Sequence, residues 1–325
     1  MKVSIIITAY KEADSVRKAL MRYIPQYIQN TKSSIDVYET LIVAPDVETE
    51  KVCHEFREFQ NNKPGYKCNE IRYIKDPGIG KPAALNLALK EAKGDVFILT
   101  DGDVYPNAYA VRELTRFFEH SQKVGAVSGR PKSISPRTTM LGYWSHVLAN
   151  MADVTRRRFT KERKPITCSG YLYAVSRRAL VEIDEHGKET MLQMPEDILS
   201  DDAYVSYIIE NRGFKILYSS AAQVFVKYPS TFSDWIKQKA RSTGGYVQLE
   251  KMGVAPKNKK NIMRGFWQEA KEITTIFKYA KNLKEVAWTG LLVLARMYLW
   301  LKIWYERRLN EKSFEETWTR IETTK

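Results

Sequence analysis

The sequence predicts an α/β fold with a mainly parallel central sheet and helices on both faces, and two patterns in its first hundred residues predict it. Short β-branched runs alternate with segments whose apolar residues recur at helical spacing. Proline and glycine punctuate these segments, as at Pro82 and Gly94. Because repeated strand–helix units build parallel sheets, ligands are expected beyond the carboxyl ends of the strands.

Each element of this half has its own signal. Strands are expected over residues 3–8, 38–44, 71–74 and 96–100, which are β-branched and apolar. Helices are expected over residues 13–27, 48–59 and 82–92, where apolar residues return every three or four positions. Pro82 suits the first turn of the third helix, and Gly94 suits a stop after it.

Composition narrows the class of protein. The chain has 325 residues, 44% of them hydrophobic and 28% charged, as in an ordinary globular protein. Its three cysteines show no CxxC or Cys/His spacing, so the sequence indicates neither a disulfide framework nor a zinc site. A reducing, cytoplasmic setting is therefore expected. The first apolar run is too short for a signal peptide or a membrane span.

Positive charge is concentrated in two places. The formal net charge is +14, and residues 226–325 hold 20 Lys and Arg against 10 Asp and Glu. Residues 155–165, "TRRRFTKERKP", add six cations and one anion. Such fields attract the phosphates of nucleic acid, lipid or nucleotide, although a solvated helix face would have the same composition.

Two aspartates directly follow the fourth strand. In "LTDGDVYP", Asp101 and Asp103 flank Gly102, so both carboxylates can face one ligand. Paired carboxylates repel unless a cation lies between them, and hard oxygen ligands suit Mg²⁺ or Mn²⁺ carrying a diphosphate. The pattern Asp-x-Asp is common by chance, and its position after a strand is what makes it informative.

Several motifs together resemble the family 2 glycosyltransferases, which have the GT-A fold, over about the first 250 residues. "VSIIITAYKEADSV" resembles the opening strand and donor-binding turn, "GKPAALNLAL" the Gly-Lys-x-x-Ala-Leu-Asn segment, "LTDGDVYP" the metal-binding Asp-x-Asp, and "CSGYLYAVSRRAL" the acceptor-side loop. The resemblance implies an inverting, metal-dependent sugar transfer by a catalytic domain over residues 1–250, followed by a C-terminal amphipathic, basic helical region over residues 251–325. It implies donor contacts from Thr8, Ala9, Tyr10, Glu12, Lys81, Asn86 and Asp101, metal contacts from Asp101 and Asp103, and acceptor contacts from Ser169, Gly170 and Asp201. Lys11 departs from the family, which usually has Asn there.

The catalytic base has two candidate positions, "PED" at residues 195–197 and the acidic pair Asp201 and Asp202. In the resembled family the acids precede a helix, a glycine about eleven positions on, and a strand, which fits Asp202 and Gly213. The resemblance thus implies that Asp202 takes the proton from the acceptor hydroxyl. A carboxylate suits this work when burial and nearby anions raise its pKa. Helix capping by these acids is the structural alternative.

A later segment resembles the Gln-x-x-Arg-Trp element of family members that build polymers. Gln238 and Arg241 fit the family's contacts to the donor diphosphate. Ser242 replaces the Trp on which the acceptor sugar packs in those members, which favours transfer of one or a few sugars. Asp46 follows the second strand where the family often contacts the base, and a uridine nucleotide is the first expectation. "DPGIGKP" lacks the phosphate-loop spacing of ATPases.

The C-terminal region is amphipathic and basic. Residues 262–283 carry one apolar stripe among lysines, and residues 286–305 form an apolar run interrupted by Arg296. This run fits a helix lying on an anionic membrane, a helix packed on the catalytic domain or on a second subunit as a homodimer, or a marginal membrane span.

The function expected is transfer of a sugar from a nucleoside diphosphate donor to a glycan or lipid-linked acceptor, peripherally at the inner face of the cell membrane and without nucleic acid as partner. One alternative is a basic membrane- or nucleic-acid-binding module on a degenerate catalytic fold, which leaves Asp101, Asp103 and Asp202 unexplained. Another is a nucleotidyltransferase, which shares the sheet and the metal.

Overall fold

The structure, a computed structural model, describes residues 1–29, 36–62, 70–256, 273–309 and 324. The chain forms two compact units, one of Met1–Pro131 and Arg156–Val226 and the other of Lys132–Thr155 and Lys227–Lys325. These units do not follow the division expected at residue 250. Helix α8 (Phe232–Lys251) contributes Trp235 and Ile236 to the apolar cluster of the second unit, so its packing assigns it there.

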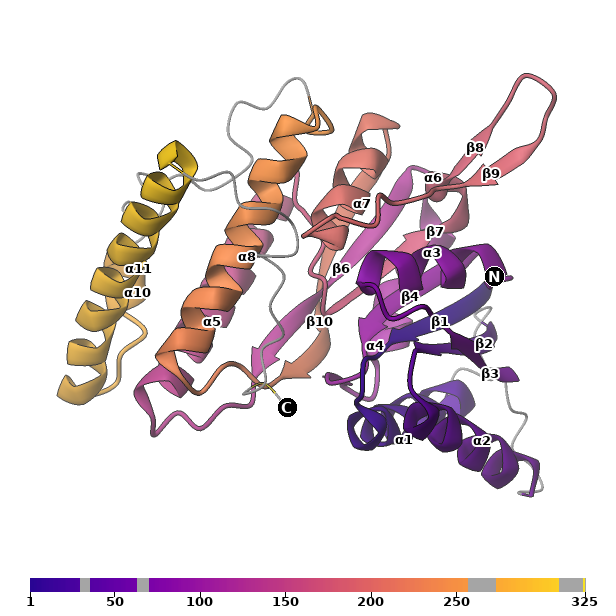
Figure 1. The fold of residues 1–325 in the computed structure, drawn as a ribbon, viewed down its shortest axis with the longest axis horizontal. Helices are drawn as coiled ribbons and strands as arrows, with labels where there is room; N and C mark the ends of the chain where they lie inside the picture. The colour runs from indigo at the N-terminus through magenta and orange to yellow at the C-terminus, as the bar shows by residue number, and fades with distance from the viewer. Residues whose placement is uncertain (30–35, 63–69, 257–272, 310–323, 325) are drawn as a thin grey trace. The chain divides into compact units, whose positions relative to one another are not determined.

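The first unit is built on an eight-stranded sheet in the order β3-β2-β1-β4-β7-β6-β10-β5 (Figure 1). Its strands are β1 (Lys2–Thr8), β2 (Asp36–Ala44), β3 (Glu70–Lys75), β4 (Val96–Asp101), β5 (Tyr105–Pro106), β6 (Val124–Ser133), β7 (Leu172–Ser176) and β10 (Lys215–Val226). Strands β1 to β4 pair in parallel, whereas β7 is antiparallel to β4 and to β6. The α/β class expected from the sequence is confirmed, and the four parallel strands are the four expected.

Helices cover both faces of the sheet (Figure 1). They are α1 (Ala13–Gln29), α2 (Val47–Asn61), α3 (Lys81–Glu91), α4 (Ala110–His120), α6 (Arg177–Leu180) and α7 (Asp201–Asn211). The chain steps outward from β1 to β2 to β3, then returns to β4 beside β1. Because crossovers between parallel strands are right-handed, this reversal places α1 and α2 on one face and α3 on the other (Figure 1).

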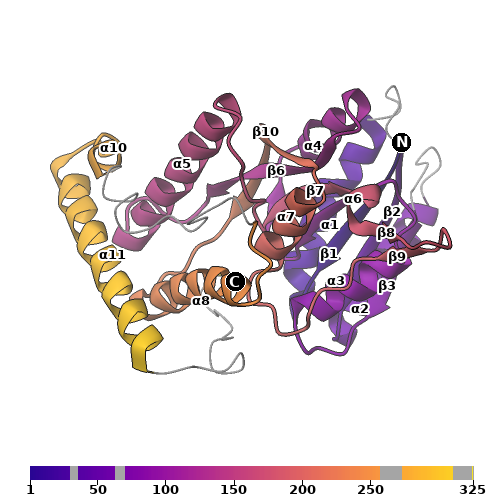
Figure 2. The same ribbon diagram turned by 90° about the horizontal axis from the view of Figure 1, so that it is seen from above.

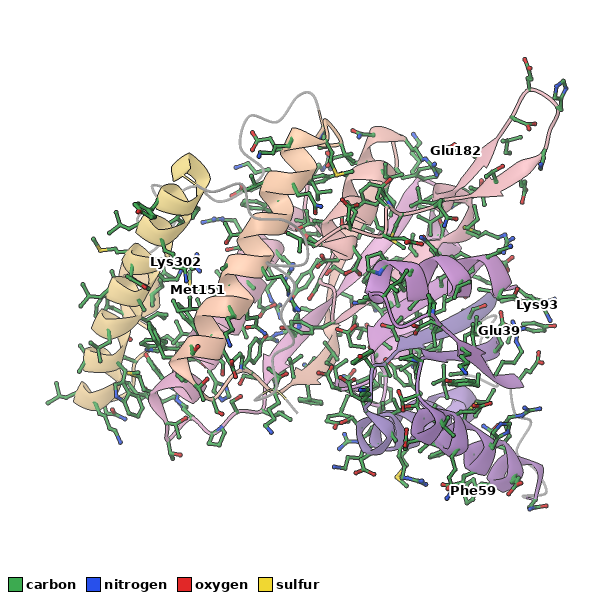
Figure 3. All side chains as sticks on the ribbon, in the orientation of Figure 1. Glu39, Phe59, Lys93, Met151, Glu182 and Lys302 are labelled. Atoms are coloured by element: carbon green, nitrogen blue, oxygen red, sulfur yellow. The ribbon has the colours of Figure 1, made fainter. Side chains whose placement is uncertain are left out.

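Apolar strands fill the core, and one buried acid ties their amino ends together. Ile5, Ile6, Ile7 and Ile98 are fully buried. Glu39, also fully buried, accepts hydrogen bonds from Ser4 Oγ at 2.6 Å and from the backbone nitrogen of Lys93, and it pairs with Arg72 at 3.0 Å (Figure 3). A buried carboxylate requires such partners, and they fix the end of the sheet opposite the expected ligand site. A small hairpin, β8 (Val181–Ile183) and β9 (Glu189–Met191), completes the unit.

The second unit is helical. It contains the first part of α5 (Met140–Lys161), α8, α10 (Ile273–Phe277) and α11 (Leu283–Leu309), visible in Figure 2. Trp144 and Trp235 meet in its cluster with ring centroids 5.4 Å apart. Arg137 binds both carboxylate oxygens of Glu285 at 2.8 Å, which holds the segment before α5 against the start of α11.

The apolar stripe expected over residues 262–283 does not lie on one continuous helix. Residues 262–272 lie outside the described residues, α10 ends at Phe277, and α11 begins at Leu283. The side chain of Asn282 accepts the backbone N–H of Glu285, which caps the start of a new helix. Among the described residues, no helix meets the length and hydropathy needed to cross a membrane.

Candidate functional site

The site forms where β1 and β4 end side by side. After β1 the chain continues outward to β2, whereas after β4 it continues into the other half of the sheet. The carboxyl ends of these two strands therefore lie where the strand order reverses, which is where open α/β sheets form a binding crevice. Thr8 Oγ1 lies 3.5 Å from Asp101 Oδ1, and Gly102 N donates to Thr8 O at 2.8 Å. A Cβ at Gly102 would lie 2.9 Å from carbons of Ala9 and Val16. Glycine therefore lets this turn lie against β1, with Asp101 and Asp103 on either side.

Lys81, at the start of α3, connects the donor-side and acceptor-side residues. Its Nζ lies 2.6 Å from Asp101 Oδ1 and 3.4 Å from Asp201 Oδ2, and it donates to Gly170 O at 3.3 Å. Burial lowers the pKa of Lys81, but the charges of Asp101 and Asp201 outweigh burial and raise that pKa above its ordinary value. Lys81 is therefore a fixed cation among these acids.

Asp202 lies in the first turn of α7 and is held by three hydrogen bonds. Its Oδ2 accepts Gly170 N at 2.7 Å, and its Oδ1 accepts Ser200 Oγ and Ala203 N, both at 2.9 Å. Burial and the neighbouring charge of Asp201 raise the pKa of Asp202, while Lys81 opposes the rise. The geometry yields an oriented carboxylate with enhanced basicity, as a general base requires.

Asp201, its neighbour, has a buried oxygen that its surroundings do not satisfy. Asp201 Oδ2 receives no hydrogen bond from any residue that the structure describes, although Lys81 Nζ, 3.4 Å away, pairs with its charge. A buried polar atom without a partner costs roughly 1–3 kcal/mol. Such an atom beside the oriented carboxylate of Asp202 is available to a ligand hydroxyl.

Two serines that sequence reasoning missed support the acceptor-side loop. Ser206 Oγ donates to Asp202 O at 2.6 Å and accepts Cys168 N at 2.9 Å, which ties the loop to α7. Ser128 Oγ on β6 accepts Ser169 N at 3.0 Å. Ser206 follows Asp202 by one helical turn, a spacing that the sequence displays. Ser128 is distant in sequence, and no local pattern marks it.

Some residues implied by the resemblance have structural partners of their own. Asp46 caps α2: it accepts Thr49 N and Lys11 N at 2.9 Å, and although burial raises its pKa, these hydrogen bonds outweigh burial and lower it. The amide of Asn86 makes two 2.8 Å hydrogen bonds with the backbone of Met194. Asn86 therefore holds the segment that leads toward α7.

The remaining donor-side residues divide between the two units. Tyr10 and Glu12 lie in the turn after β1, where Glu12 Oε2 would be 3.4 Å from a Cβ at Gly102. Gln238 and Arg241 lie one turn apart on α8 of the second unit. The Gln238 side-chain oxygen is buried and accepts no hydrogen bond from the described residues.

The donor set at the end of β4 fits a hard divalent cation. Asp101 and Asp103 offer carboxylate oxygens, and Asp101 is about a quarter exposed, at 26%. The described residues contain no group of three His, Cys, Asp or Glu side chains that could hold a metal ion. Mg²⁺ and Mn²⁺ accept such incomplete protein sets when phosphate oxygens and water supply the other ligands.

Comparisons with known proteins agree with this architecture. The model of the glycosyltransferase like family 2 matches residues 1–245. A probable glycosyltransferase, YdaM, of Bacillus subtilis is 26% identical over 257 residues, which are 77% of this chain and 56% of that protein. A poly-beta-1,6-N-acetyl-D-glucosamine synthase of Staphylococcus aureus is 27% identical over 172 residues, 52% of this chain and 40% of the synthase. The chain thus spans about half the length of these relatives.

A solved structure shares the fold. The mannosyltransferase PcManGT from Pyrobaculum calidifontis, in complex with GDP-Man and Mn²⁺, superposes with a TM-score of 0.63 at 18% identity, covering 95% of this chain and 88% of that one. At this identity the likeness establishes the GT-A fold. Because the family model matches three quarters of its length and the carboxylates lie at the switch point, the chain belongs to the glycosyltransferase like family 2.

Proposed function

We propose that this glycosyltransferase transfers a sugar, with inversion, from a nucleoside diphosphate donor to a hydroxyl of a glycan or lipid-linked acceptor. The observation that carries the proposal is that Lys81 pairs with Asp101 and also donates to Gly170 O, the residue whose N–H holds the carboxylate of Asp202. A nucleotidyltransferase or a binding module has no need of an oriented carboxylate on the side away from the diphosphate.

The reaction follows from the positions of the acids. The acceptor oxygen attacks the anomeric carbon while the bond from that carbon to the diphosphate oxygen breaks, and the nucleoside diphosphate leaves with the electron pair. Asp202 takes the proton of the attacking hydroxyl, because Gly170 N and Ser200 Oγ hold its carboxylate in place and its pKa is raised. Attack from the face opposite the leaving group inverts the anomeric centre.

Charge neutralisation on the leaving group is the other requirement. Mg²⁺ or Mn²⁺ held by Asp101 and Asp103 would stabilise the departing diphosphate. Arg241 and Gln238 are proposed as further diphosphate contacts, on the resemblance of their segment and the guanidinium's affinity for phosphate oxygens. Tyr10, Glu12 and Asp46 are proposed on the nucleoside side. Uridine is the proposed base on the position of Asp46 after β2.

The first experiment is nucleotide release from UDP-, GDP- and dTDP-sugars with Mg²⁺ or Mn²⁺. We expect slow hydrolysis of one donor, which requires the metal and is abolished by Asp101→Ala. Asp184→Asn, in the β8–β9 hairpin, is the matched control, and it should keep full hydrolysis. Absence of binding and turnover for every nucleotide sugar would refute the transferase and leave the binding module.

Attachment to an anionic membrane surface is proposed for the outer face of α11. One face of this helix is buried in the second unit, through Glu285, Thr289, Leu292, Ala295 and Leu299. The opposite face repeats in heptads of large apolar residues that are 46–65% exposed: Leu291, Leu294, Tyr298, Leu301 and Tyr305. An exposed apolar stripe in a basic region fits the interface of an anionic bilayer.

Flotation with vesicles tests this attachment. The wild type should float with phosphatidylglycerol vesicles, and a Leu294→Glu, Leu301→Glu double variant should remain in solution. Val286 lies near the start of the helix and outside this stripe, so each single variant, Leu294→Glu or Leu301→Glu, should lose more flotation than the charge-matched control Val286→Glu. A concentration-dependent dimer that the double variant dissociates, without flotation of the wild type, would replace the membrane by a homodimer through these helices.

A further inference from the structure

The basic end of α5 leads directly into the acceptor-side loop. Arg156 to Lys164 carry six cations, and only four residues separate Lys164 from Ser169. All of them belong to the first unit, as do Asp201 and Asp202. A concentrated positive field therefore enters the same loop that positions the catalytic carboxylate.

Part of this charge has an ordinary structural explanation. Arg158 and Lys161 lie in the last turn of α5, where cations are stabilised by the unpaired carbonyls of the helix. Lys164 pairs with Glu162 at 2.7 Å, and Arg163 adopts the left-handed conformation with φ of 53° that turns the chain out of the helix. These cations need no ligand to account for them.

Arg156 is different because it precedes the last turn and is directed inward. It is half-buried, and its guanidinium lies 6.0 Å from the ring centroid of Tyr218 on β10. Burial raises the pKa of the Cys168 thiol to about 12, and the charge of Arg156 acts in the opposite direction. Arg156 thus lies near Cys168, two residues before Gly170, whose N–H holds Asp202.

The neighbouring acids define what such a cation can do. Asp101, Asp201 and Asp202 repel any anion, and Lys81 is already engaged with two of them. A neutral acceptor sugar would need no arginine beside the acceptor-side loop. An acceptor with an anionic group would need one, because an unpaired anion brought beside these carboxylates meets like charge. A planar guanidinium can donate two parallel hydrogen bonds to two oxygens of a phosphate.

We propose that the acceptor carries a phosphate group, and that Arg156 binds this phosphate while a separate acceptor hydroxyl faces Asp202. This inference rests on the proposed sugar transfer and names the chemical class of its acceptor. The phosphate is a handle and not the nucleophile, since an ionised phosphate oxygen has no proton for Asp202 to remove. A soluble sugar phosphate and a lipid phosphate share this chemistry.

Binding measurements test the proposal without knowledge of the acceptor sugar. The full chain is saturated with metal and with the nucleoside diphosphate of the donor it hydrolyses, so that the diphosphate contacts are occupied. Calorimetry then compares inorganic phosphate, glucose 6-phosphate and glucose, and a second arm compares phosphatidylglycerol with monoacylglycerol in detergent micelles. We expect the phosphate compounds to bind and their phosphate-free counterparts to bind at least tenfold more weakly. The arm with the tighter phosphate binding identifies the source.

Variants assign the binding to Arg156. Arg156→Gln should weaken phosphate binding about tenfold or more and leave donor hydrolysis by water unchanged. Arg156→Lys should have an intermediate effect, because lysine keeps the positive charge but lacks the two parallel N–H donors of the guanidinium. Arg112→Gln is the control, because Arg112 lies 5.9 Å from the ring of Tyr109 in a similar contact on α4. Phosphate binding that is absent, or equal in the wild type and Arg156→Gln, would overturn the inference while donor hydrolysis still supports the transferase. Absence of donor hydrolysis in the wild type would overturn both.

Discussion

Replacing Gly170 by alanine should impair catalysis much more than folding. A Cβ at this position would lie 3.1 Å from Asp202 Oδ2 and 3.3 Å from its Cγ. Ordinary contact between such atoms begins near 3.4 Å, so the carboxylate must move by a few tenths of an ångström and weaken its 2.7 Å hydrogen bond from Gly170 N. Since misplacement of a reacting group by 1 Å can cost about 100-fold, we expect kcat to fall roughly tenfold. Unfolding free energy should change by less than about 1 kcal/mol, because Gly170 is not among the glycines with positive φ.

Donor hydrolysis and transfer, measured beside urea unfolding, separate the two effects. Gly290→Ala is the matched control, since Gly290 lies in α11 with no atom within 4 Å of the added Cβ. That substitution should leave kcat unchanged and stabilise the chain by up to about 1 kcal/mol through helix propensity. A Gly170→Ala enzyme with wild-type kcat would show that Asp202 does not need its present position, and the assignment of Asp202 as base would be wrong.

Three further predictions follow from the contacts. The raised pKa of Asp202 places the acid limb of the kcat/KM profile above the ordinary aspartate range, and activity falls as pH drops through that limb. Asp201→Asn should move the limb to lower pH, because the substitution removes a like charge beside Asp202. A limb that does not move would contradict this assignment. The hydrogen bond from Arg137 lowers the pKa of Glu285 to about 2, so its stabilisation is complete above about pH 4.5 and is lost as pH falls toward 2. Arg137→Ala should therefore cost about 2 kcal/mol at pH 7 and much less near pH 2 by thermal unfolding, and an equal cost at both would exclude this ion pair as the cause. Asn86→Ala should cost about 3 kcal/mol in urea unfolding by leaving two buried backbone groups of Met194 unpaired, whereas a cost below about 1 kcal/mol would mean that water replaces the amide.

The sequence predicted the parallel half of the fold because its signals are local. The expected strand at residues 96–100 is observed as Val96–Asp101. The break before α11 was missed because the apolar stripe continues through it. The helix starts anew there because the side chain of Asn282 accepts one hydrogen bond from the backbone N–H of Glu285. The contact of Lys81 with Asp201 joins positions 120 apart, and no periodicity reports such a distance.

Lys81 explains how three carboxylates share one crevice before a donor arrives. Asp101 ends β4, and Asp201 and Asp202 begin α7. Packing and hydrogen bonds fix both positions, so these carboxylates cannot move apart to reduce their repulsion. The half-buried ammonium of Lys81 offsets one of their charges, and it donates to Gly170 O as well, so the same cation holds the acceptor-side loop. The crevice thus keeps a net negative charge that favours a divalent cation and its diphosphate over a free anion. An anionic acceptor then requires a separate cation, which is the role proposed for Arg156.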